Sequence, residues 1–212
     1  EGADVMTGSS HKTFPGPQGG FLLSSSEDER FQKRLNNAMF PGVCSSYHLH
    51  HVAGKVMALS EFQEYGAAYA KDTVRNAKAF AGALAAEGFD VLAESRGYTA
   101  SHQVLTRHGT TDSGAGTKVA QLLEDGGIVT NMNMLPGDTK ALTPSGLRLG
   151  VQELTRVGFT PDEMQDVARF YARILIHGED PSKVRVDVKE LKSEFQTIRY
   201  CFNEEGRSGY PL

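Results

Sequence analysis

The stretch DVMTGSSHKTFPGPQGG, Asp4 to Gly20, decides the fold expected for this sequence. A short apolar run leads through hydroxyl-bearing residues to His11 and Lys12, and prolines and glycines follow. A lysine held in a pocket or near other cations loses its proton more easily and can attack a carbonyl carbon to form a Schiff base. Nearby hydroxyls and free backbone N–H groups are what a phosphate needs. The stretch therefore suits a lysine pocket beside a phosphate, although its residue types also suit a surface loop with an ordinary lysine.

The composition is typical of a soluble globular protein and excludes several functional classes. The 212 residues are 39% hydrophobic and 23% charged, with a net charge of −4 and a pI near 6.0. Such a balance gives no basic patch for nucleic acid, and no apolar run reaches membrane-spanning length. No signal peptide is visible, and Cys44 and Cys201 imply no disulfide framework. We expect a cytoplasmic protein that binds neither nucleic acid nor membrane.

Alternating strand-like and helix-like segments predict an α/β or α+β chain. A small polar residue, Ser26, stands before a run of acids at the start of one helix, and Gly88 is a candidate helix C-cap. The expected strands are 20–24 (buried), 89–93, 102–106, 128–130 and 147–151. The expected helices are one beginning near 26 and ending at 40–42, a long one over 52–86 with a break near 66, 116–123, one beginning at 160, and 184–195.

Arg148 is the second residue that points to a site. It lies between leucines in Ser145–Gly150, within an expected strand. A buried arginine needs a partner, and a carboxylate held by two parallel hydrogen bonds is the natural one. The segment thus indicates carboxylate binding, while an arginine on an exposed strand face remains the alternative.

These motifs resemble those of the serine hydroxymethyltransferases, pyridoxal-phosphate (PLP) enzymes of the aspartate-aminotransferase fold. The match consists of Ser9–Thr13 followed by Gly16–Gly20, and of Pro144–Gly150. Gln18, where many relatives have arginine, makes this segment similar to the archaeal-type branch of the family. The resemblance implies that Lys12 forms the Schiff base with PLP, that Ser10 and His11 contact the cofactor, and that Arg148 clamps the amino-acid carboxylate. It also implies a catalytic role for His11, for which a packed histidine is the alternative.

A further match follows Phe40-Pro41-Gly42. In the family this loop reaches the PLP phosphate of the neighbouring subunit, which implies phosphate contacts from Ser45 and Ser46 and a homodimer with shared sites. His50 falls on the family's histidine and is expected at the substrate. Ser46 and Tyr47 depart from the Asn and His of archaeal relatives. A zinc site at the neighbouring histidines is disfavoured because no cysteine or carboxylate stands at ligand spacing, and no metal is expected.

Two other segments contain residues that are similar to those of known motifs. Thr130–Asn133 resembles the family's Val-Asn-Lys-Asn, which implies that Asn133 lies near the pterin of the one-carbon carrier, and Met132 replaces the usual lysine. An asparagine that satisfies turn backbone at a strand end is the alternative. Gly114–Lys118 lacks phosphate-loop spacing and is interpreted as a helix N-terminus without a ligand.

In the family a long N-terminal half precedes the lysine and supplies the pyridine-nitrogen aspartate, the stacking ring and a proton-transfer glutamate. This sequence therefore resembles the C-terminal half. The expected fold is the α/β PLP-dependent transferase fold, with residues 1–60 as part of the large domain, 61–87 as a linking helix and 88–212 as the small domain. Missing strands would leave sheet edges and apolar faces exposed, so poor solubility is expected.

The implied function is PLP-dependent interconversion of serine and glycine, with tetrahydrofolate or a tetrahydromethanopterin-like carrier as the reduced pterin. A threonine-type aldolase or transaldolase shares the lysine and the arginine but needs no pterin. A third possibility is a non-catalytic fragment that requires an N-terminal half. Serine cleavage measured with and without a pterin separates the first two.

Overall fold

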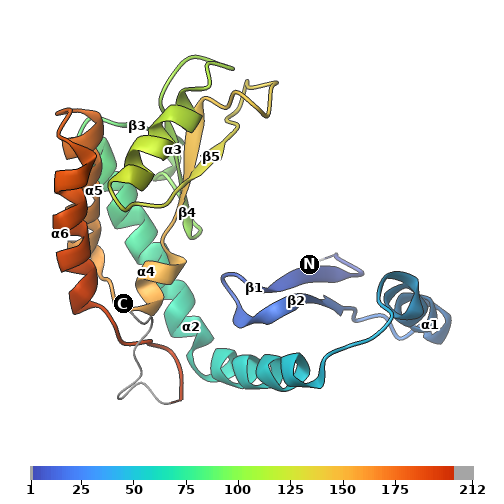
Figure 1. The fold of residues 1–212 in the computed structure, drawn as a ribbon. Helices are drawn as coiled ribbons and strands as arrows, with labels where there is room; N and C mark the ends of the chain where they lie inside the picture. Colours follow the sequence, from blue (N-terminus) through green and yellow to red (C-terminus); the bar gives the residue numbers. More distant parts are fainter. Residues whose placement is uncertain (1, 203–212) are drawn as a thin grey trace. The chain divides into compact units, whose positions relative to one another are not determined.

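A computed structural model describes residues 2–202 and shows a mixed α/β chain (Figure 1). The chain forms two compact units, Glu1–Gly66 and Ala67–Leu212. The predicted boundaries at 60 and 87 remain predictions, and residues 203–212 of the predicted small domain lie outside the described part. No helix in that part is long and apolar enough to cross a membrane.

The first unit contains a hairpin and two helical segments before the long helix that runs on into the second unit. Its elements are β1 (Met6–His11), β2 (Pro15–Leu23), α1 (Glu29–Asn37), the π-helical segment η1 (Ala38–Val43) and the start of α2 (Leu49–Ala86).

The second unit continues α2 and adds a sheet with helices around it. Its elements are β3 (Asp90–Val91), the 3-10 segment η2 (Glu94–Arg96), β4 (Gln103–Arg107), α3 (Ala115–Asp125), β5 (Asn131–Asn133), β6 (Gly146–Gly150), α4 (Gln152–Arg156), α5 (Pro161–Leu175) and α6 (Pro181–Glu194).

The hairpin of β1 and β2 carries the opening sequence stretch. The strands are antiparallel from Met6↔Leu23 to His11↔Pro15, with an irregularity between Ser9 and His11. The expected strand at 20–24 is present but begins earlier, and its expected burial is wrong for this chain because Leu23 is 53% exposed. The start of α2 contacts the hairpin around Pro17, Gly19 and Gly20 but leaves Leu23 exposed.

Helix α1 begins two residues later than expected. Asp28 is its N-cap, because the Asp28 carboxylate accepts hydrogen bonds from the N–H groups of Arg30 (2.8 Å) and Phe31 (3.4 Å). Ser26 instead accepts the N–H of Asp28 at 3.3 Å. The helix ends in η1, where Phe40 has non-helical backbone angles.

Helix α2 is continuous through Gly66, so the expected break is absent. It ends as predicted at Gly88, which has φ +94°. The N–H of Gly88 donates to Ala85 and that of Phe89 to Leu84, both at 3.0 Å. These two bonds form a Schellman motif, which satisfies the last carbonyls of the helix.

The sheet of the second unit has the strand order β3-β4-β6-β5, and every pair is antiparallel. Val104, Leu147 and Leu149 are at most 3% exposed and face the hydrophobic core, while Arg148 lies between two of them in the alternation. Because successive strand side chains point to opposite faces, Arg148 lies on the sheet face away from this core. Figure 1 shows α5 and α6 side by side in this unit.

One predicted strand is misplaced. Residues 128–130 are not a strand, and β5 follows at Asn131–Asn133. The N–H of Ile128 donates to Leu123 at 2.8 Å, and Gly127 has φ +82°. The N–H of Ile128 therefore closes the end of α3 and is not available to pair with a neighbouring strand. The predicted strands near 89–93, 102–106 and 147–151 match β3, β4 and β6.

Candidate functional site

Lys12 lies in the turn between β1 and β2 and is exposed. It makes no hydrogen bond or ion pair within residues 2–202, and its pocket stays a prediction. Ser10 is 1% exposed, and its hydroxyl donates to the carbonyl of Pro17 at 2.8 Å. His11 Nδ1 lies 3.1 Å from the carbonyl oxygen of Gly19. The side chains of Ser10 and His11, just before the lysine, therefore connect its turn to β2.

The start of α2 packs against the same hairpin. Lys55 Nζ donates to the carbonyl of Gly20 at 3.2 Å, and His51 hydrogen-bonds to the backbone of Gln18. Gly19 has φ +144°, and an added Cβ would lie 2.6 Å from Lys55 Nζ. Sequence reasoning considered His51 only as a disfavoured zinc ligand, and it missed Lys55. Their spacing of four residues on a helix was the available signal, because it places both on one face.

The predicted phosphate loop and histidine lie just before and at the start of α2. Ser45 and Ser46 are exposed, and their hydroxyls make no hydrogen bond within the described part. The His50 and His51 ring centroids are 4.4 Å apart. Burial, followed by the charges of His50, His48 and Lys55, lowers the pKa of His51.

Among residues 2–202, no group of three or more His, Cys, Asp or Glu side chains is placed to hold a metal. Cys44, which is exposed, and Cys201, which is buried, are both free thiols.

Arg148 lies in the central part of the second unit's sheet. It is directly opposite Leu105 of β4 and Asn131 of β5, on the face away from the core. The side chain is half-buried, and no residue within 2–202 gives it a hydrogen bond or an ion pair. Its charge acts on His102, whose pKa is lowered first by burial and then by Arg148. A half-buried guanidinium without an acidic partner is suited to an external carboxylate.

The predicted pterin residue lies on the same face. Asn133 is opposite Gly146, and its amide donates to the carbonyl of Met134 at 2.6 Å. Asn131, which sequence reasoning missed, is the direct cross-strand neighbour of Arg148. Side chains at such positions have Cβ atoms about 4.5–5.5 Å apart. Arg148, Asn131 and Asn133 thus form a polar group that we call the strand cluster.

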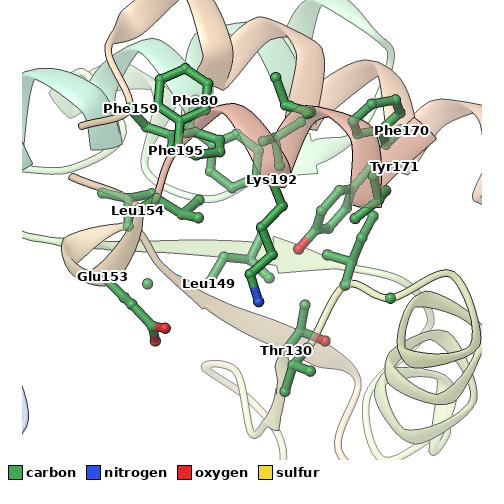
Figure 2. Close-up of a pocket in the computed structure, with 18 of the residues that line it drawn as sticks. Phe80, Thr130, Leu149, Glu153, Leu154, Phe159, Phe170, Tyr171, Lys192 and Phe195 are labelled. Atoms are coloured by element: carbon green, nitrogen blue, oxygen red, sulfur yellow. The ribbon is translucent and has the colours of Figure 1, made fainter. Parts of the chain in front are cut away.

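A cavity of about 260 Å³ lies elsewhere in the second unit, on the core side of β6. Figure 2 shows the rings of Phe80, Phe159 and Phe195 along it and the side chain of Lys192 reaching across it. Leu149 lines it, whereas Arg148 does not. The cavity contains none of the residues predicted for the site.

Comparison with solved structures identifies the class of fold. An L-threonine transaldolase from Pseudomonas fluorescens, described in its internal aldimine state, matches with a TM-score of 0.86 and 32% identity. The match covers 95% of this chain and 46% of that one. The chain therefore has the PLP-dependent transferase fold.

Comparison with family models gives the family. Residues 1–171 match the model described as serine hydroxymethyltransferase, and the chain belongs to this family. Serine hydroxymethyltransferases from Pyrococcus horikoshii and Thermococcus kodakarensis are 54% and 52% identical to it. The matches cover 96% and 100% of this chain and 48% and 49% of those proteins. The chain thus spans about half the length of the curated relatives it matches, which fits the expected C-terminal part.

Proposed function

We propose that this chain supplies the lysine and the carboxylate-binding group of a PLP-dependent hydroxymethyltransferase that interconverts serine and glycine. A reduced pterin, tetrahydrofolate or tetrahydromethanopterin, is the proposed one-carbon carrier. The observation that carries the proposal is Arg148, half-buried on an open sheet face without an acidic partner within the described residues. Membership of the family supports the same reaction.

The residues present fit the cofactor in part. The exposed Lys12 amine makes no hydrogen bond or ion pair within the described part, so its lone pair is available to a carbonyl carbon once the proton is lost. The exposed hydroxyls of Ser45 and Ser46 are the donors proposed for the phosphate of a neighbouring subunit. When bound, PLP supplies the electron sink for negative charge at the substrate Cα. Ser10 and His11 would orient the lysine turn through their bonds to Pro17 and Gly19.

The strand cluster would bind and orient the substrates. Arg148 would hold the amino-acid carboxylate by two parallel hydrogen bonds, an arrangement that lysine cannot reproduce. Burial and the charge of Arg148 lower the pKa of His102, which favours its neutral form and leaves the anion to Arg148. Asn133 carries amide donors and acceptors suited to a pterin ring, and His50 is proposed to contact substrate. A cytoplasmic homodimer with shared sites is part of the proposal.

A threonine-type aldolase or transaldolase is the second candidate. The structural match to an L-threonine transaldolase favours it, and the same lysine and arginine would serve. Cleavage of threonine without pterin, together with no activity on serine with pterin, would favour the aldolase or transaldolase over the hydroxymethyltransferase.

The test measures visible absorbance during titration with PLP. The full chain is used alone and with the part of the Pyrococcus horikoshii relative that this chain does not match. That part, called the remainder below, is produced separately. Lys12→Ala removes the proposed Schiff-base lysine, and Lys33→Ala, which changes an exposed lysine of α1, is the matched control from the same unit. We expect a Schiff-base band in the parent and in Lys33→Ala but not in Lys12→Ala. A band of equal strength in all three proteins contradicts the assignment of Lys12, and a band only with the remainder shows that the site needs both parts.

A further inference from the structure

One carboxylate, that of Asp138, links the two ends of the loop between β5 and β6. Asp138 Oδ2 accepts hydrogen bonds from the N–H of Leu135 (2.9 Å) and from both the N–H (2.9 Å) and the hydroxyl (2.8 Å) of Ser145. Its other oxygen accepts the N–H of Asp112 at 2.8 Å. A single side chain therefore ties both ends of this loop to each other and to the loop before α3.

Asp112 returns the contact from the other side. Its carboxylate accepts the N–H of Thr139 (2.8 Å), the hydroxyl of Thr139 (2.7 Å) and the N–H of Lys140 (2.9 Å). Asp112 has φ +56°, a backbone conformation that aspartate tolerates better than most residues. The two aspartates thus bind each other's loops reciprocally, and we call this arrangement the aspartate clasp.

Both carboxylates are held in their charged form. The backbone N–H groups of Leu135, Asp112 and Ser145 hold the pKa of Asp138 far below its usual range. Hydrogen bonds from Thr139 and Lys140 lower the pKa of Asp112, which outweighs the opposing effect of the Asp138 charge. Hydrogen bonds that favour the charged form have this effect, so the aspartate clasp persists at neutral pH.

The tied residues are next to the strand cluster. Leu135 comes two residues after Asn133, and Ser145 comes three residues before Arg148. Ser145 is fully buried, and its carbonyl accepts the N–H of His108 at 3.0 Å, which anchors it to the end of β4. The aspartate clasp therefore fixes the two points at which β5 and β6 leave the sheet.

We propose that Asp138, supported by Asp112, is a positioning residue that keeps Arg148 and the asparagines of β5 in register for substrate. This inference rests on the proposed function, since it concerns how that site is held rather than what it binds. Neither aspartate hydrogen-bonds to the side chains of the strand cluster. Both would act on it through the backbone of the loop.

The first test uses the full chain and needs no activity. Amide hydrogen exchange at Leu135 and Ser145 and the NMR titration of His102 are compared in the parent, Asp138→Asn and Asp180→Ala. Asp180 caps α6 by accepting the N–H of Ser182 at 2.9 Å, so its loss is a matched control away from the loop. We expect at least tenfold faster exchange in Asp138→Asn, together with a rise in the pKa of His102 as Arg148 loses its fixed place.

Unchanged exchange and an unchanged His102 pKa in Asp138→Asn would overturn the proposal. If that variant fails to fold, Ser145→Ala removes only the hydroxyl bond at 2.8 Å and should show the same changes to a smaller degree. Asp112→Asn keeps one accepting oxygen and should disturb the loop less than Asp112→Ala.

The second test uses the enzyme assembled with the remainder of the relative. Asp138→Asn should raise KM for the amino acid about tenfold or more with a smaller change in kcat, whereas Asp180→Ala should leave both unchanged. Faster exchange with an unaltered KM would show a merely structural clasp and leave the proposed function standing. Inactivity of the parent assembly would count against the proposed function, and the His102 titration would still decide whether Asp138 positions Arg148.

Discussion

Single residues explain how this chain responds to pH. His108 is packed against the ring of Phe89, with centroids 6.1 Å apart, and its Nε2 lies 2.8 Å from the hydroxyl of Thr106. Burial lowers the pKa of His108 from 6.5 to about 4, against the opposing effect of the Asp90 charge. The native state therefore holds this histidine neutral, while the unfolded chain protonates it near pH 6.5.

We expect the free energy of unfolding to increase between pH 4 and pH 6.5. In that window the unfolded state binds the proton that native His108 rejects, so the stabilising effect is complete above pH 6.5 and disappears by pH 4. The contribution is at most about 3 kcal/mol. Urea unfolding at pH 4.5 and pH 7 measures it, and His108→Gln should show a smaller difference than the parent. An equal difference in the two proteins would rule out His108 as the source.

The sequence predicts residues that carry their own chemistry better than residues that depend on register. Lys12 and Arg148 stand out because a lysine among glycines and an arginine between leucines are unusual in any fold. Asn131 is next to Arg148 only because β5 pairs with β6 in one register. Asp138 becomes informative only when the loops are placed in space, so no local pattern identifies it. The spacing of His51 and Lys55 indicates a shared helix face, but not that this face meets the hairpin.

Helix α5 shows an element whose start was predicted and is confirmed. Thr160 and Glu163 form a capping box: the N–H of Thr160 donates to the Glu163 carboxylate at 2.6 Å, and the N–H of Asp162 donates to the Thr160 hydroxyl at 3.4 Å. Pro161 occupies the first turn, where a missing N–H is harmless. Capping motifs are local in sequence, which explains why this boundary was predictable.

Thr160→Ala should lower the free energy of unfolding by about 1 kcal/mol because it removes the cap of α5. Thermal unfolding followed by circular dichroism measures the effect. Thr160→Ser keeps the hydroxyl and should remain close to the parent. If the alanine and serine variants have the same Tm, the hydroxyl does not stabilise the helix.

The mispredicted elements fail for a common physical reason. Residues 128–130 have a strand-like pattern, but the Schellman-like end of α3 takes the N–H of Ile128. Ser26 has a capping side chain, yet Asp28 caps α1 because its carboxylate reaches two N–H groups of the first turn. In both places two segments of similar propensity compete, and the hydrogen bonds of the neighbouring helix decide the outcome.

At the scale of the whole molecule, the hydrophobic core belongs to the second unit. Every buried residue of the core cluster lies at or beyond Ala77, including Leu84, Leu147 and Met164 at 0% exposure. Within the described residues of the first unit, Ala58 is the one buried hydrophobic side chain. Large apolar side chains of that unit are exposed instead: Met6, Leu23, Met39, Phe40, Val43, Tyr47, Leu49, Val52, Val56, Met57, Leu59 and Phe62.

We expect the first unit to bind an apolar fluorescent dye and to exchange its amides faster than the second. Adding the part of the Pyrococcus horikoshii relative that this chain does not match should cover these side chains, because exposed apolar surface that gathers in one place marks an interaction site. Dye fluorescence should then fall, whereas an unrelated protein at the same concentration should leave it unchanged. Undiminished fluorescence with the remainder would show that the surface has another partner or none.

Helix α2 runs across the boundary between the units, since Gly66 and Ala67 are interior residues of a 38-residue helix. At about 1.5 Å per residue the helix is about 57 Å long. Expressing the polypeptide as two pieces divided at that boundary would cut this helix and leave two new frayed ends. A cut in the short segment between η1 and α2, residues 44–48, spares the helix. It leaves the long helix whole on one piece and places β1, β2, α1 and η1 on the other, so that the Lys55 contact to Gly20 becomes a contact between the two pieces.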